Sequence, residues 1–299
     1  MGQPYPVLDY VKELPFGVPA LERPASPFGY HTPIVPKSPK FRGPLPNGPA
    51  EVTYYFPIGQ LNCNPTGVFF PAGFSFPGEI DVILYFHGFK QGKFTNINEY
   101  WSGRLLGIRL REDVNSAGKR VVLIAPTLGE RPGSRDHGDM RLFAQPGGGD
   151  AFLAEVVRWI GKYVPEYTGR SVTPSVRKVV LAGHSGAGVI LNTQAWSMNT
   201  PICEVWGFDS LYGGEDLAVA SWLSLARTRP DIRFFFHWGT SPLRGNATEL
   251  GDLARADLTN IATQESKSLP GEKPDSNAHH FSVLTANFPT RVKAMRCSP

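Results

Sequence analysis

Cysteine, charge and long apolar runs are all scarce in this chain of 299 residues. The three cysteines, Cys63, Cys203 and Cys297, lack metal-ligand spacing. They leave open either one disulfide with a free thiol or a fully reduced chain. Charged residues make up only 19%, and the basic ones are scattered, although the formal net charge is +4. A phosphate-tracking surface needs clustered basic residues, so we expect no nucleic-acid partner.

The sequence also lacks the patterns of membrane segments. No apolar run approaches the length that spans a bilayer, and no charged segment followed by an apolar one opens the chain. We therefore expect no integral membrane segment. The protein is either cytoplasmic or exported by a signal outside this sequence. Its many prolines, glycines and aromatic residues, with few charges, favour an exported protein. The oligomeric state is left open.

Proline dominates the first fifty residues, which hold twelve of them between Pro4 and Pro49. Proline lacks a backbone donor and biases the preceding residue toward extended geometry, so this stretch is neither a helix nor a central strand. It is too apolar for a solvated tail, which favours an extended arm packed on the main domain over a disordered linker. One domain, residues 51–299, is expected to follow the arm of residues 1–50.

Short apolar runs alternate with helical patterns in the rest of the chain. Val52–Phe56 and Gly67–Phe70 have the alternation of antiparallel edge strands. The runs typical of strands buried on both faces are Ile80–Phe86, Arg120–Ala125, Val179–Ala182, Val205–Phe208 and Ile232–Phe236. The helical patterns are Trp101–Val114, Asp150–Val164 with Asp150 as N-cap, Leu217–Arg227, Leu250–Thr263 and Phe281–Met295. This alternation predicts an α/β fold with a mostly parallel sheet covered by helices on both faces.

The most informative motif is Gly183-His184-Ser185-Gly186-Ala187, which joins a buried strand to a helical pattern. A serine between very small residues at a strand–helix turn is typical of a nucleophile elbow, where backbone strain exposes the hydroxyl. Ala187 departs from the usual glycine at that position. The alternative is a serine that caps an ordinary helix.

The ends of the other predicted strands test this hypothesis, because side chains at the carboxyl ends of parallel strands gather at one edge. The run Ile80–Phe86 ends in His87-Gly88-Phe89, where a glycine would let backbone amides approach a developing oxyanion. The expected donors are the amides of Phe89 and of Gly186, the residue after the serine. A tight strand-end turn with a satisfied histidine is the alternative.

The acid and the base are expected after the serine along the chain. Asp209 follows the run Val205–Phe208 and could orient a histidine, or it could simply cap a loop; Glu249 and Asp252 are the later acids. The only late histidines are His279 and His280, of which His280 is preferred because it opens the last helical pattern.

One further histidine, His137, lies in a polar loop with two aspartates. Such loops are commonly solvated, so we expect no metal site there.

Together these motifs resemble those of α/β-hydrolase-fold serine hydrolases of the esterase and lipase kind. His87-Gly88-Phe89 is similar to the oxyanion turn of lipases, and His280-Phe281 is similar to a late His-Phe pair common in esterases. Asp209 resembles the acid after the sixth strand of pancreatic-type lipases, whereas most of the superfamily places the acid one strand later. The resemblance spans roughly Glu51 to Met295 and does not cover the proline-rich arm.

The resemblance implies a carboxylic ester hydrolase with the triad Ser185, Asp209 and His280, acting on a small or polymeric ester without a cofactor. The residues expected around the substrate are His87, Gly88, His184, Tyr212 and Trp238. Core packing is the alternative role for the aromatic ones. An acyltransferase or a peptidase would use the same triad, and a non-catalytic binding protein with this fold would need none of it.

Overall fold

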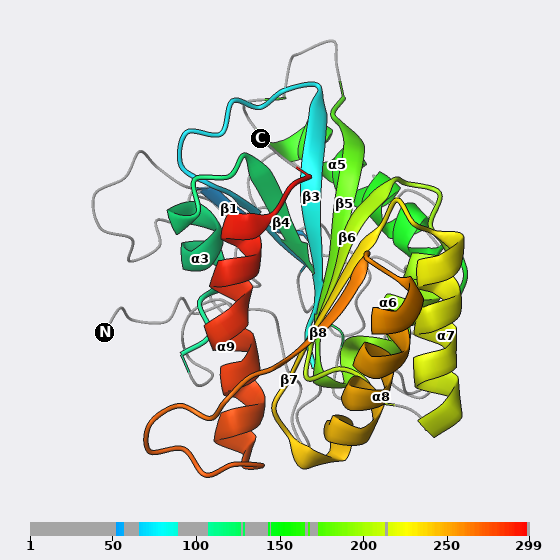
Figure 1. Ribbon diagram of the computed structural model, residues 1–299. Coiled ribbons are helices and arrows are strands. Elements are labelled where there is room, and N and C mark those ends of the chain that lie inside the picture. Colours follow the sequence, from blue (N-terminus) through cyan, green and yellow to red (C-terminus); the bar gives the residue numbers. More distant parts are fainter. Residues whose placement is uncertain are drawn as a thin grey trace.

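The computed structural model describes residues 52–56, 66–88, 107–126, 128, 143, 145–164, 167, 173–212 and 215–297. The predicted arm, Cys63, Phe89 and the His137 loop lie outside these residues. The described residues include an eight-stranded sheet with the order β1-β2-β4-β3-β5-β6-β7-β8 (Figure 1). Its strands are β1 Val52–Phe56, β2 Thr66–Phe70, β3 Glu79–Phe86, β4 Val121–Ala125, β5 Ser175–His184, β6 Ile202–Phe208, β7 Arg233–Trp238 and β8 Ile261–Glu265.

The direction of the strands determines where functional residues gather. β2 runs antiparallel to both β1 and β4. The other six strands, β3 to β8, are mutually parallel. Their carboxyl ends therefore meet at a single edge of the sheet, as the sequence predicted for the strands it recognised.

Helices cover both faces of the sheet (Figure 1). The helices are α3 Leu110–Ser116, α5 Gly148–Tyr163, α6 Gly188–Ser197, α7 Glu215–Thr228, α8 Ser241–Asp257 and α9 Asn277–Ala294. Residues of α5 to α8 join one hydrophobic cluster, and residues of α3 and α9 join the other. In β3, Val82 and Leu84 belong to the first cluster, while Ile83 and Tyr85 belong to the second. This double burial explains why the central strands are continuous apolar runs rather than alternating ones.

The sequence-based boundaries were wrong at the end of the sheet. The predicted helix 250–263 covers part of α8, which begins earlier, at Ser241, and ends at Asp257. Pro242 in the first turn is compatible with this start, because the amide that proline lacks would have no helical partner there. The residues after α8 form β8, a polar edge strand of sequence IATQE with one buried residue, Ile261. It lacks the apolar run by which the other parallel strands were recognised.

The helix starts also differ from the prediction. α5 begins at Gly148 after a left-handed Gly147, so Asp150 is not its N-cap. The Asp150 carboxylate instead accepts hydrogen bonds from the backbone of Asn199 and Thr200. Of the helix predicted at 101–114, residues 101–106 lie outside the described part, and α3 begins only at Leu110.

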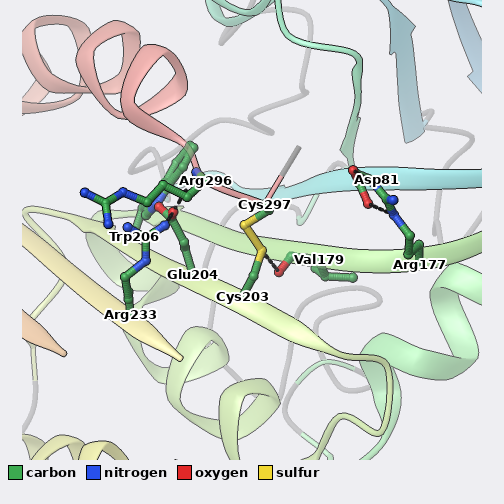
Figure 2. Close-up of a disulfide and its surroundings, with 9 residues drawn as sticks. All are labelled: Asp81, Arg177, Val179, Cys203, Glu204, Trp206, Arg233, Arg296 and Cys297. Carbon is green, nitrogen blue, oxygen red and sulfur yellow. Dashed lines mark hydrogen bonds and ion pairs between the residues drawn. A yellow bond between two sulfur atoms is a disulfide. The ribbon is translucent and has the colours of Figure 1, made fainter. Parts of the chain in front are cut away.

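A disulfide joins Cys203 of β6 to Cys297, three residues beyond the end of α9 (Figure 2). Beside it, the buried Glu204 carboxylate accepts a hydrogen bond from the Arg296 amide at 3.1 Å, another from Trp206 at 2.7 Å, and an ion-pair contact from Arg233. The segment that follows α9 is thus joined to β6 by a covalent bond at Cys297 and by a hydrogen bond at Arg296. No described helix is long and apolar enough to cross a membrane.

Candidate active site

Ser185 lies in a left-handed backbone conformation directly after β5. Its φ is +56°, a region that residues with a side chain rarely adopt, and a 3-10 turn, Ser185–Ala187, links it to α6. Such a conformation costs on the order of 1–3 kcal/mol and persists only where the surrounding structure enforces it. The strand–turn–helix context predicted for a nucleophile elbow is therefore present.

Two glycines accommodate this turn. A Cβ at Gly183 would lie 3.1 Å from the Ala187 Cβ, and one at Gly188 would lie 1.8 Å from the Ser210 carbonyl oxygen. Gly183 thus makes room for the alanine that departs from the usual pattern. Gly188 is the position where the helix start touches the loop after β6, a requirement that the motif alone did not reveal.

Asp209 lies at the end of β6 and is fully buried. Its Oδ1 accepts hydrogen bonds from the amides of Gly239 at 3.0 Å and Thr240 at 3.3 Å, and its Oδ2 accepts one from the Thr240 hydroxyl at 2.7 Å. Burial by itself would raise the pKa of Asp209, but the hydrogen bonds from His280 and Gly239 outweigh it and lower that pKa. The group is therefore a carboxylate at neutral pH.

His280 is the histidine that pairs with this carboxylate. Its Nδ1 lies 2.5 Å from Asp209 Oδ2, and its side chain is 15% exposed. Because a carboxylate only accepts, Nδ1 carries the proton in the neutral ring, which leaves a lone pair on Nε2. α9 begins at Asn277, capped by the Ser276 hydroxyl, so His280 lies in its first turn.

The neighbouring His279 is engaged elsewhere. Its Nδ1 accepts from the Asp275 amide at 3.2 Å, and its Nε2 donates to the Ser266 carbonyl oxygen at 2.9 Å. The side chain is buried. Both ring nitrogens of His279 therefore bind backbone groups.

The alternative acids are on the surface of α8. Glu249 and Asp252 are both exposed, and Asp252 forms an ion pair with Arg255 at 2.9 Å. Neither supplies the carboxylate that contacts His280.

The turn after β3 lies directly against the serine. A Cβ at Gly88 would be 2.6 Å from the Ser185 Cβ and 3.2 Å from the His184 carbonyl oxygen, so this position requires glycine. His87 is fully buried: its Nε2 accepts from the Leu128 amide at 2.6 Å, and its Nδ1 therefore donates to the Gly88 carbonyl at 2.5 Å. Burial lowers the pKa of His87 to about 4, although the Gly88 bond opposes this, so the ring is neutral at pH 7.

His184, the residue before the serine, packs against the His280 ring. Their ring centroids are 4.5 Å apart, and His184 Nε2 lies 3.0 Å from the His280 carbonyl oxygen. Burial, and then the proximity of His280, lower the pKa of His184 to about 3. This side chain is fully buried and neutral.

The two remaining residues expected around a substrate differ in exposure. Trp238 is only 8% exposed and belongs to the core cluster on the α5–α8 side, whereas Tyr212 is 39% exposed. Burial and then the charge of Asp209 raise the pKa of Tyr212, while hydrogen bonding with the side chains of Ser185 and Thr240 opposes the rise. Of these two residues, Tyr212 is therefore the one that borders the serine and remains open to solvent.

The structure thus brings Asp209 and His280 together, packs His184 against the His280 ring and sets Gly88 against Ser185. The sequence did not single out Gly239 and Thr240, which bind the acid; their signal was a glycine followed by a hydroxyl residue just after a strand end. The described residues contain no group of three or more histidine, cysteine, aspartate or glutamate side chains that could hold a metal.

This strand order, with a strained strand–helix turn after β5, is that of the α/β-hydrolase fold. The chain matches no protein-family model and no curated protein. Among solved structures it is similar to a ferulic acid esterase, with a TM-score of 0.51 and 17% identity over 83% of this chain and 99% of that one. It is also similar to a mutant feruloyl esterase module from Clostridium thermocellum complexed with sinapinate, with a TM-score of 0.51 and 12% identity over 88% and 95% of the two chains. At these identities the likeness shows the fold.

Proposed function

We propose that this protein is a serine hydrolase that cleaves carboxylic esters through an acyl-enzyme on Ser185. The observation that supports this most strongly is the 2.5 Å contact between His280 Nδ1 and the buried Asp209 carboxylate, at the same edge of the sheet as the strained Ser185. Esterases among the similar structures agree with this reaction class. A helix-capping serine would require neither the acid nor the histidine.

In the proposed reaction, Ser185 Oγ attacks the acyl carbon while His280 Nε2 takes the hydroxyl proton. The Asp209 carboxylate fixes the Nδ1–H tautomer and stabilises the imidazolium that forms. His280 then returns the proton to the leaving alkoxide, and a water molecule, activated in the same way, hydrolyses the acyl-enzyme.

Backbone amides would stabilise the oxyanion of the tetrahedral intermediate. Gly186 supplies one amide at the start of the turn after the serine, and the sequence assigns the second to Phe89. Each donor in comparable sites contributes on the order of 3 kcal/mol to the transition state. The contact between Gly88 and Ser185 supports this assignment, because it holds the turn that leads to Phe89 against the nucleophile.

We assign substrate contact to Tyr212 and positioning to His87 and His184. The latter two are fully buried, and both use a ring nitrogen to bind a backbone carbonyl. Trp238 packs in the hydrophobic core, so we assign it a structural role and no substrate contact.

The test is hydrolysis of nitrophenyl esters of increasing acyl length, alongside matching anilides that report amide cleavage. We expect ester turnover that falls by several orders of magnitude in Ser185→Ala and His280→Ala. Ser224→Ala, an exposed serine on α7, is the matched control and should retain full activity. Ester turnover that survives in Ser185→Ala would exclude the proposed mechanism.

A further inference from the structure

One turn, between β7 and α8, supplies most of the hydrogen bonds to the Asp209 carboxylate. Oδ1 accepts from the amides of Gly239 and Thr240, and Oδ2 accepts from the Thr240 hydroxyl and from His280 Nδ1. Each carboxylate oxygen thus accepts two bonds. Thr240 provides two of these four, one from its backbone and one from its side chain.

The Thr240 hydroxyl makes this bond in place of its usual one. Thr240 is the N-cap residue of α8, where a threonine hydroxyl normally accepts a hydrogen bond from the second or third amide of the helix. It makes no such bond here. The Asp275 carboxylate, from the loop before α9, instead accepts from the Ser241 amide at 2.6 Å and from the Ser241 hydroxyl. Asp275, which lies outside α8, thus accepts the hydrogen bond from the first amide of the helix. The Thr240 hydroxyl donates to Asp209 instead.

The turn has little room to move. A Cβ at Gly239 would lie 2.7 Å from His279 Nε2 and 2.6 Å from Val283, so the backbone at this point is pressed against α9. The backbone of Asp209 is also bound to β7, the strand that leads into this turn, because the Asp209 amide donates to the His237 carbonyl at 2.7 Å. The donors of Gly239 and Thr240 therefore hold a constant position relative to the acid.

We propose that Thr240 is a positioning residue for the reaction, whose hydroxyl orients Asp209 Oδ2 toward His280 and withdraws part of its charge. This inference rests on the proposed function and names a residue that acts through the acid. Among the described residues, the charged or titratable groups around Asp209 are His280 of α9, Tyr212 on its own loop and the neutral His184 at the end of β5. None of these replaces the hydroxyl on Oδ2.

Removal of the hydroxyl has a consequence that a purely structural role would lack. With a single donor left on Oδ2, the carboxylate keeps more negative charge and stabilises the imidazolium more strongly. The acid limb of the kcat/KM profile, which reports protonation of the catalytic base, should then move to higher pH. At the same time kcat should fall, because the carboxylate can rotate away from its optimal orientation.

The experiment compares Thr240→Val, which keeps the shape and the amide, with Thr240→Ser, which keeps the hydroxyl. We expect kcat to fall about 10- to 100-fold in Thr240→Val, because this is the effect expected from the loss of one hydrogen bond to a charged group. KM should change little, and the acid limb of the profile should lie at higher pH. Thr240→Ser should restore both. Thr240→Ala gives the same test if Thr240→Val does not fold. Ser241→Ala, which removes the hydroxyl bond to Asp275 at the same helix end, is the matched control and should leave kcat and the pH profile unchanged.

The outcomes separate the two proposals. If the wild-type protein hydrolyses no ester in the panel, the proposed function fails. If the wild type is active and a folded Thr240→Val or Thr240→Ala variant has the same kcat and the same acid limb, the role of Thr240 is refuted while the proposed function stands.

Discussion

His184 Nε2 donates a hydrogen bond of 3.0 Å to the carbonyl oxygen of His280. The bond joins the residue before Ser185 to the residue that pairs with Asp209, and the centroids of the two rings, which are tilted by 35°, lie 4.5 Å apart. The end of β5 and the first turn of α9 are thereby fixed to each other next to the proposed reacting atoms. Because Nε2 donates, His184 must be in its neutral Nε2–H form or be charged, and burial excludes the charged form at neutral pH.

His184→Phe tests this relationship, because phenylalanine keeps a ring against His280 but cannot donate. A net hydrogen bond of about 1 kcal/mol corresponds to a several-fold effect, and we expect kcat to fall roughly three- to tenfold with KM nearly constant. The control is His237→Phe, another buried histidine, which stacks on Phe208 and makes no side-chain bond to His280. Steady-state kinetics of both variants decide the matter, and equal kcat values for the two would contradict a positioning role for His184.

Gly88→Ala should abolish ester hydrolysis while the protein still folds. The added Cβ would lie 2.6 Å from the Ser185 Cβ, closer than real contacts allow, so the serine or the turn after β3 must shift. Gly245→Ala on α8 is the matched control, since nothing lies within 4 Å of its Cβ and alanine favours helix by up to about 1 kcal/mol. Turnover measured beside a thermal melt distinguishes the two, and a fully active Gly88→Ala would show that no such approach exists.

Acid should destabilise the fold through its buried histidines. The pKa of His237 is lowered from 6.5 to about 4, chiefly by burial and then by Arg291, and that of His87 is likewise lowered to about 4. Between pH 6.5 and 4 the unfolded chain binds protons that the folded protein does not, so the free energy of unfolding falls as the pH falls. A shift of this size at His237 corresponds to about 3 kcal/mol across that window.

His237→Phe removes one of these protons from the unfolded state. Denaturant titrations between pH 4 and 7 should give a shallower pH dependence for this variant than for the wild type, with a difference approaching one proton. Parallel curves would mean that His237 does not become buried in its neutral form.

Reduction of the Cys203–Cys297 disulfide should lower the stability by about 2–5 kcal/mol, because the bond closes a long loop, with a sequence separation of 94 residues. The double variant Cys203→Ala/Cys297→Ala should melt at the same temperature with or without reductant, whereas the wild type should lose several degrees in reductant. Such a bond forms in oxidising compartments. A wild-type melting temperature that is the same with and without reductant would argue against a structural role for the disulfide.

Much of the fold could be predicted from the sequence, because strands that are buried on both faces, such as β3 and β4, contain continuous runs of apolar residues. β8 was missed for the converse reason: as a polar edge strand it has only Ile261 buried. The sequence also failed to locate the start of α8, since Ser241-Pro242 precedes a stretch with polar residues on most positions. Edge elements leave weak patterns because solvent, rather than the core, surrounds them.

For the site, the pairing of Asp209 with His280 rather than with His279 could be favoured but not decided from the sequence. Two adjacent residues in a first helical turn point in different directions, and only the fold shows that His279 is bound to the Ser266 carbonyl. The support from Thr240 was invisible for a similar reason. A threonine at a helix start predicts a cap, and here the tertiary structure gives its hydroxyl a different acceptor.

The central claim is that the folded protein activates Ser185 as a nucleophile, and covalent labelling tests it most directly. The native protein is incubated with a fluorophosphonate, digested, and the modified peptide is identified by mass spectrometry. The account predicts one adduct per chain, on Ser185, formed far more slowly in His280→Ala and Asp209→Asn and absent after denaturation. An unmodified Ser185 in the folded protein, or labelling whose rate is unchanged in His280→Ala, would contradict it.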